Sequence, residues 1–452
     1  MLPSARMRAL RAAAASFLLF FAAGLALSWP SLRWPMVYDD LHLLRPFTPE
    51  ERAQAWRGSW DPDGIEHPGF RPLTLLFNET RYRLFGENVA VHRVLLVVLF
   101  GLYASLLVGL AIELGAPAAG AIGGGLLLVC SRYSVYHYVW LTDGNHPFQG
   151  SLFALAALAL VHGLRRRSWP RLALSLLSFV AMLLVREDGL ALVPVLLLFG
   201  FAAAPSARRL LLAFSAALVT MSLALFLYRM LAVPGAPGPG LDVKSFLLAV
   251  VRSLNLVGPE SFDGASRAVA WIWAAAPVLV GAGLLARRRA AEAGLAWLFL
   301  AAAVIACAPA LTFRRDDMLF FPASFAALFY GTALPSIARD RRALRAAAVT
   351  LLASGAIGGA YTSRAFALNF HPDSARAIRW NAQMLYGPYA ERATIPAERR
   401  AAVTRQLAAQ GVASAADLPA LGSRIGAARS GGPFHPARPG TLFYPPLPEN
   451  DF

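Results

Sequence analysis

Charge, lysine and cysteine are all scarce in this chain of 452 residues. Charged residues make up 15% of the sequence and hydrophobic residues 57%, whereas an average soluble domain carries about 25% charged residues. This balance excludes a soluble globular protein and an intrinsically disordered chain. The two cysteines, Cys130 and Cys307, offer neither a metal-binding spacing nor a disulfide framework. We interpret both as small core hydrophobic residues.

The most prominent feature of the sequence is a series of long apolar runs. A helix that crosses the hydrocarbon core of a bilayer needs about 20 apolar residues, and eleven runs come close to that length. They lie at 12–29, 90–112, 116–131, 148–164, 171–186, 189–205, 210–231, 268–286, 293–312, 318–338 and 344–362. The runs predict an all-α polytopic membrane protein with about eleven transmembrane helices in residues 1–362.

The basic residues indicate how these helices are oriented. Lys244 is the only lysine, and the arginines do not gather on one face, so we expect no nucleic-acid partner. They concentrate in alternate connections, such as 165–167, 287–289 and 339–345. This positive-inside bias predicts a cytoplasmic N-terminus and a C-terminus on the opposite side. The abundance of arginine, alanine, glycine and proline suggests a bacterial source, so we expect the inner membrane and a periplasmic C-terminus.

This topology places three sizeable segments outside the cytoplasm. Residues 30–89 form a long first outer loop, and residues 232–267 form a second, rich in proline and glycine. Residues 363–452 form a small polar C-terminal tail, which we also expect outside the cytoplasm. Function should therefore be sought on the outer face.

Charged residues gather at the predicted outer ends of the helices, while the centres of the runs are almost free of them. They are Asp39, Asp40, Arg186, Glu187, Asp188, Arg229, Arg314, Arg315, Asp316 and Asp317. Ionisable residues near membrane-spanning segments are functional candidates by default. This placement favours chemistry at the depth of a lipid headgroup over passage of an ion through the midplane.

Two of these positions have a clear chemical use. The adjacent carboxylates of Asp39 and Asp40 suit a general base, although an isolated pair is more often a solvated loop or a helix N-cap. Arg71 is of the residue type suited to bidentate phosphate binding. By itself, however, it can equally be an arginine whose head reaches the membrane surface.

Taken together, these features resemble a known family. The matching segments are VYDD (37–40), FRPLTLLFN (70–78), LFGEN (84–88) and His92 at the start of the second run. Their order is similar to that in membrane glycosyltransferases of the GT-C type, most of all the branch with the protein O-mannosyltransferases and their TMTC relatives. This chain lacks the tetratricopeptide array, and the late arginine motif is only echoed by RRDDMLFFPAS (314–324).

The resemblance implies a GT-C-like fold that moves a sugar from a polyprenyl-phosphate donor to an outer acceptor: a protein, a glycan or a lipid. It implies that Asp39 is the catalytic base, with Asp40 as its partner or substitute, and that membrane lipid is a further partner. The implied substrate-binding residues are Arg71, Arg229, Arg314, Arg315, Glu187, Asp188 and His92. Glu187 and Asp188 can instead simply pair with Arg186.

No cofactor follows with certainty, but a divalent metal is possible, because the first-loop acid binds one in some GT-C enzymes. We predict no metal ligands: His137 and His146 have no third ligand at a zinc-like spacing. The alternative function is a multi-pass transporter or flippase for a lipid-linked or small substrate. Such folds usually have paired repeats and polar sites at the midplane, and neither is evident in this sequence.

The topology can be tested with a reporter that is active only outside the cytoplasm. Fused after Phe452, it should be active, because the arginine clusters orient every preceding connection. A matching reporter that is active only in the cytoplasm should be silent at the same position. Cytoplasmic activity there would contradict the eleven-span topology.

Overall fold

The computed structural model describes residues 5–65, 69–134, 136–233, 242–257, 265–286, 291–311, 319–338, 342–367, 371 and 375–417. Within these ranges every regular element is helical, as expected for an all-α protein. The α-helices are α1 (Ala5–Ser28), α2 (Asp40–Leu43), α3 (Pro49–Arg57), α4 (Pro72–Phe85), α5 (Val89–Glu113), α6 (Ala118–Cys130), α7 (Tyr136–Val139), α8 (Asn145–Arg166), α9 (Trp169–Val185), α10 (Val193–Ala203), α11 (Arg208–Ala232), α12 (Val243–Leu254), α13 (Ala265–Ala286), α14 (Ala291–Ala306), α15 (Phe320–Ala338), α16 (Arg342–Ala367), α17 (Ala375–Tyr386) and α18 (Ala397–Ala409). Short 3-10 turns join several of them, including η3 (Thr142–Gly144) and η4 (Glu187–Leu192).

Seven helical segments in the described ranges are long and apolar enough to cross a membrane, or eight if a bent pair is counted as one span. They are Ala14–Ser31, Val89–Glu113, Thr142–Arg166, Pro205–Ala232, Ala293–Leu311, Phe320–Ala338 and Arg342–Ser363, and the bent pair is Ala118–Cys130 with Arg132–Val139. The other predicted runs form the shorter apolar helices α9, α10 and α13. The chain is therefore a multi-pass membrane protein, while the count of eleven spans stays a prediction.

Burial varies strongly among these helices. In the most hydrophobic stretch of α15, 89% of the residues are buried, whereas in those of α11 and α16 only 22% of the residues are buried. Peripheral helices carry apolar side chains on their outer faces, such as Leu212 and Leu231 on α11, which are 69% and 82% exposed. In a bilayer these side chains face lipid tails, so their exposure costs nothing. The bundle thus has a protein core around α15 and a lipid-facing periphery.

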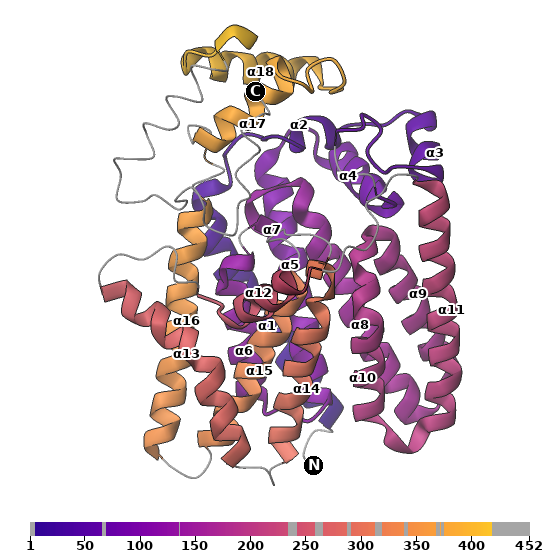
Figure 1. Ribbon diagram of the computed structural model, residues 1–452, viewed down its shortest axis with the longest axis vertical. Coiled ribbons are helices and arrows are strands. Elements are labelled where there is room, and N and C mark those ends of the chain that lie inside the picture. Colours follow the sequence, from indigo (N-terminus) through magenta and orange to yellow (C-terminus); the bar gives the residue numbers. More distant parts are fainter. Residues whose placement is uncertain are drawn as a thin grey trace.

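One end of the bundle carries a cap of shorter helices. Figure 1 shows α2, α3, α4, α17 and α18 beyond the ends of the long helices, with the N-terminus at the opposite end. We call this the capped end. The predicted first outer loop supplies α2–α4, and Thr48 begins α3 with a capping box to Glu51, followed by Pro49 in the first turn.

The described part of the C-terminal tail packs against the first loop. Leu41 and Leu44 of the loop share one buried cluster with Ile378 of α17 and Leu407 of α18. The tail is polar overall, but its few apolar residues recur on one helical face, and burying that face against the first loop removes it from water.

Small residues allow two core helices to come very close. A Cβ added at Gly124 of α6 would lie 2.7 Å from the carbonyl oxygen of Ala327 on α15. Gly120 and Gly331 are packed against each other's backbone even more closely. Close backbone approach at small residues is a principal source of helix association in membranes, where there is no hydrophobic driving force between helices.

We therefore expect Gly331→Ala to lower the melting temperature of the detergent-solubilised protein. The added methyl group has no space, and overpacking typically costs about 1–3 kcal/mol. Gly294→Ala on α14 is the matched control, since a Cβ there meets nothing within 4 Å. The control should leave stability unchanged or raise it by up to about 1 kcal/mol. Equal effects of the two substitutions would contradict this packing.

Candidate functional site

The acidic pair lies in a sharp turn at the capped end, formed by residues 38–44. We call this segment the acid turn. Tyr38, directly before the acidic pair, has a φ of +51°, a left-handed conformation that is uncommon outside glycine and must be held by its surroundings. Its backbone N–H donates to Asn381 Oδ1 at 3.1 Å, and its ring stacks on Trp380 at 5.2 Å between centroids. Strained residues held in this way cluster at functional sites.

The two carboxylates have different surroundings. Asp40 is fully buried. Its Oδ1 accepts a hydrogen bond from the backbone N–H of Thr142 at 2.8 Å, and its Oδ2 accepts one from Val37 at 3.4 Å. Burial raises the pKa of Asp40, while the Thr142 hydrogen bond and the charge of Arg93 counteract part of that rise. Asp40 therefore anchors the first loop to η3.

Asp39 is the N-cap residue of α2, but its side chain does not cap that helix. It is 5% exposed and lies between the strained Tyr38 and the anchored Asp40. An N-cap role for this pair was the simple alternative, and the geometry does not support it. The two backbone hydrogen bonds of Asp40 give it a structural role, and the assignment of Asp39 as the base stays a prediction.

Two buried arginines beside Asp40 were not identified from the sequence. Arg81 donates to the Leu141 carbonyl at 2.9 Å and to Asn78 Oδ1 at 2.7 Å. Burial lowers the pKa of Arg81 to about 10, and the charge of Asp40 opposes this shift. Arg93 donates to the Val139 carbonyl at 3.2 Å and to the Ser31 carbonyl. A charged residue inside the second apolar run was the signal that could have revealed Arg93.

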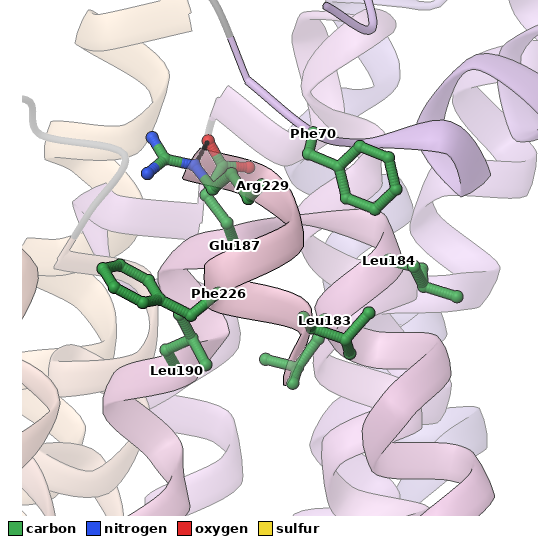
Figure 2. Close-up of a pocket in the computed structure, with 8 residues that line it drawn as sticks. Phe70, Leu183, Leu184, Glu187, Leu190, Phe226 and Arg229 are labelled. Carbon is green, nitrogen blue, oxygen red and sulfur yellow. Dashed lines mark ion pairs between the residues drawn. The ribbon is translucent and has the colours of Figure 1, made fainter. Parts of the chain in front are cut away.

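A pocket lies nearby at the top of α11. Its lining residues are Phe70, Leu183, Leu184, Glu187, Leu190, Leu225, Phe226 and Arg229, and its empty volume is about 270 Å³ including the open mouth. Figure 2 shows Arg229 and Glu187 side by side on one wall, with Phe70 on another. We call it the arginine pocket. Its apolar floor and charged rim suit a molecule with a lipid part and an ionic part.

Glu187 is shared by two of the predicted arginines. Arg71 Nε donates to Glu187 Oε2 at 2.9 Å, and Arg229 Nε lies 3.8 Å from Glu187 Oε1. The structure thus brings together three residues that are far apart in the sequence. Two cations around one carboxylate leave an excess positive charge, which would attract an anion such as a phosphate.

Asp188 has different hydrogen-bond partners from Glu187. It accepts hydrogen bonds from Arg186 Nε at 3.2 Å and from Gln149 Nε2 at 2.9 Å. Burial opposes its ionisation, but the charges of Arg186 and His146 outweigh it and lower the pKa of Asp188 to about 2. The simpler interpretation of Asp188, a partner of Arg186, agrees with this geometry.

His92, another predicted substrate-binding residue, lies outside the lining of the arginine pocket. It is fully buried, its Nε2 is 2.9 Å from the Gly86 carbonyl oxygen, and its ring packs edge-on against Phe85. It holds the turn between α4 and α5, and its role in substrate binding stays a prediction. Arg314 and Arg315 lie outside the described residues.

His137, Asp143 and His146 form a candidate cation site, although the sequence indicated no third ligand beside the two histidines. The Nδ1 atoms of His137 and His146 lie 3.0 and 2.9 Å from the two carboxylate oxygens of Asp143. All three residues are buried, and the Nε2 atoms of both histidines have no hydrogen-bond partner among the described residues. Two imidazoles and a carboxylate are suitable ligands for a transition metal. The Asp-x-x-His spacing on one helix face was the missed signal.

A second cluster of similar composition is less suited to a metal. His42 Nδ1 lies 3.1 Å from Asp63 and 3.8 Å from Asp61. Asp63, however, also accepts hydrogen bonds from Arg45 at 3.2 Å and Thr394 at 2.8 Å. These hydrogen bonds, together with that from His42, lower the pKa of Asp63 although burial opposes it. The carboxylate is thus already satisfied within the protein.

No protein-family model and no curated protein matches this chain. Among solved structures it is similar to the crystal structure of the Archaeoglobus fulgidus oligosaccharyltransferase tethered to an acceptor peptide, with 13% identity and a TM-score of 0.48. The same archaeal protein, AglB, in complex with an inhibitory peptide and a dolichol-phosphate gives 12% identity and a TM-score of 0.46. The crystal structure of the apo form of the Archaeoglobus fulgidus protein has 13% sequence identity to this chain and a TM-score of 0.45. The matches cover 84% of this chain but only 58 or 59% of those longer proteins.

If the cluster of His137, Asp143 and His146 binds a metal, Zn²⁺ or Mn²⁺ should raise the melting temperature of the solubilised protein. A ligand at 100 times its Kd adds about 2.7 kcal/mol of stability. Asp143→Asn should abolish the shift. His162→Gln, at the other end of α8, should keep it. The same shift in all three proteins would exclude this site.

Proposed function

We propose that this protein is a glycosyltransferase that moves a sugar from a polyprenyl-phosphate-linked donor to an acceptor on the non-cytoplasmic side of the membrane. In this proposal the capped end faces the periplasm of a bacterium. The observation that carries it is the joint placement of a buried acid turn and the arginine pocket at this end. A base for the acceptor and positive charge for a leaving phosphate are the two things such a transfer needs.

The acid turn and the arginine pocket are linked through the segment from η3 into α8. The Thr142 N–H binds Asp40, and Gln149 binds Asp188, the neighbour of Glu187. In the proposed complex the donor phosphate lies at the arginine pocket, and the anomeric carbon, which is bonded to the phosphate oxygen, faces the acid turn.

In the proposed reaction, Asp39 takes a proton from the nucleophilic group of the acceptor. A bond forms between that group and the anomeric carbon of the sugar, and the bond from this carbon to the phosphate oxygen breaks. The lipid phosphate leaves with the bonding electron pair. Arg71 and Arg229 stabilise the charge that develops on it, since guanidinium groups bind phosphate through two parallel hydrogen bonds.

Glu187 has a distinct part in this proposal. In the absence of donor it neutralises Arg71 and approaches Arg229, and so keeps both guanidiniums in place at the rim of the pocket. A donor phosphate would compete with this carboxylate for the same hydrogen-bond donors. Binding is then an exchange of one anion for another, and less uncompensated charge is buried than if the pocket were only cationic.

The acid assignment predicts different outcomes for two adjacent substitutions. Asp39→Asn should lower turnover by about 10²- to 10⁴-fold, the usual contribution of a general base, with little change in melting temperature. Asp40→Asn should lower the melting temperature, because it removes the negative charge beside Arg81 and Arg93. Turnover can be followed with radiolabelled polyprenyl-phosphate sugars in proteoliposomes.

Acceptors for this assay should include peptides, glycans and lipids. The archaeal structures contain an acceptor peptide and a dolichol-phosphate, so a peptide and a dolichol-linked donor are the first to test. Near-wild-type transfer by the Asp39→Asn protein would show that Asp39 is not the base. Reversed effects of the two substitutions would assign the chemistry to Asp40.

The phosphate assignment predicts that Arg229→Lys raises the donor KM by about tenfold. Lysine cannot reproduce the planar fork of arginine, and a hydrogen bond to a charged group contributes about 1.5–3 kcal/mol. Arg209→Lys is the matched control, because Arg209 is exposed at the opposite end of the same helix. If both substitutions leave the KM unchanged, Arg229 only anchors α11 at the membrane surface.

A further inference from the structure

We infer that α17 and α18 form a positioning unit for the acid turn, in which Arg399 and Asn381 are positioning residues. The inference rests on the proposed function and assigns a role to the C-terminal tail. Three separate contacts carry it, and all of them join the tail to the first loop. The partners are more than 300 positions apart in the sequence.

The first contact is a side-chain cap on α2. Arg399, on α18, is 5% exposed. Its Nη1 donates to the carbonyl oxygens of Asp40 and Leu41, and its Nη2 to that of Leu44, each at 2.8 Å. Glu87 holds the same guanidinium at 2.7 and 3.1 Å. One arginine therefore binds three carbonyls of the turn that contains the acids.

This cap matters because α2 has only four residues. A single helical turn is unstable by itself, since its nucleation fixes several residues for one hydrogen bond. Its terminal carbonyls also lack partners within the helix. The guanidinium supplies those partners and places a positive charge at the negative end of the helix dipole. The orientation of α2, and with it that of the acids, depends on a residue outside the loop.

The second contact acts on the other side of Asp39. Asn381 of α17 is fully buried, and its Oδ1 accepts the backbone N–H of Tyr38. Trp380 stacks on the Tyr38 ring, and Trp140, just before η3, stacks on Trp380 at 5.8 Å. A non-glycine residue with positive φ persists only when its surroundings over-determine it. These contacts come from the tail and from the residues before α8.

The third contact lies further along the first loop. Thr394, between α17 and α18, donates its N–H and its hydroxyl to the two carboxylate oxygens of Asp63, at 3.0 and 2.8 Å. Arg392 donates to the Gly64 carbonyl at 3.0 Å. The tail thus holds the loop at both ends of the segment from 38 to 64, and the acid turn lies at its start.

The test compares Arg399→Gln with Arg405→Gln, a control in the same helix at an exposed position. Hydrogen–deuterium exchange of the full-length protein in detergent reports on the turn directly. We expect the amides of residues 38–44 to exchange about 10- to 100-fold faster in Arg399→Gln, as for loss of hydrogen bonds to a charged group. Peptides of α5 and α15 should be unchanged, and Arg405→Gln should match the wild type throughout.

Asn381→Ala is a second variant in case Arg399→Gln does not fold. It should also speed exchange at residue 38 and its neighbours, because the strained N–H loses its acceptor. Unchanged exchange of this segment in both variants would overturn the inference. A uniform rise across the whole protein would also overturn it, since the tail would then support only global stability.

Turnover gives an independent readout. With a dolichol-phosphate-linked sugar as donor, both variants should lower kcat by tenfold or more and leave the donor KM unchanged, because the arginine pocket is not altered. A rise in KM with an unchanged kcat would contradict a positioning role. If the wild-type protein transfers no sugar at all, the proposed glycosyltransferase activity fails, and the exchange experiment still decides whether the tail positions the turn.

Discussion

The buried carboxyl group of Asp40 is the constraint on which the capped end depends. In an interior of low dielectric constant such a polar group must be hydrogen-bonded, or it is strongly destabilising. Asp40 meets this need with the backbone N–H of Thr142 and the nearby charge of Arg93. Each of these partners belongs to a different part of the chain. Satisfying one carboxylate therefore draws the first loop, the start of α5 and η3 into one arrangement.

The same arrangement separates two roles within an adjacent pair of residues. Asp40 is engaged with the backbone, and Asp39 occupies the turn that this engagement creates. A general base must have a fixed position relative to its substrate, and rigid support from a neighbour provides it. In the proposed mechanism the acid pair thus combines a structural carboxyl group, Asp40, with the base, Asp39, a division that the adjacent identical residues do not reveal in the sequence.

The arginine pocket follows a related electrostatic logic at a second place. Arg71 and Arg229 are close enough to repel each other, and Glu187 between them lowers the cost of bringing them together. The elements that carry the two arginines are tied to their own neighbours: Thr74 of α4 donates to the carbonyl of Val185 in α9, and Tyr228 of α11 donates to the carbonyl of Trp56 in α3. A phosphate entering the pocket would meet donors already in place.

Much of the architecture was predictable because membrane insertion depends on local sequence. Each apolar run forms a helix, since backbone groups in lipid must be satisfied within their own segment. Glu187 and Arg229 were both placed at the outer ends of helices by the sequence, because charges at the same ends of neighbouring helices share one depth in the membrane. The motif position of His92, by contrast, says nothing about which carbonyl its ring meets.

Only the tertiary structure decided how Asp40 is held, which residues complete the candidate cation site, and what the tail contacts. Asp40 differs from Asp39 through a hydrogen bond to Thr142, more than 100 positions away. His137 meets Asp143 because the chain bends between α7 and α8. Arg399 reaches α2 across more than 350 positions. A sequence specifies periodicity and composition along the chain, whereas these pairings arise from long-range packing, which no local pattern encodes.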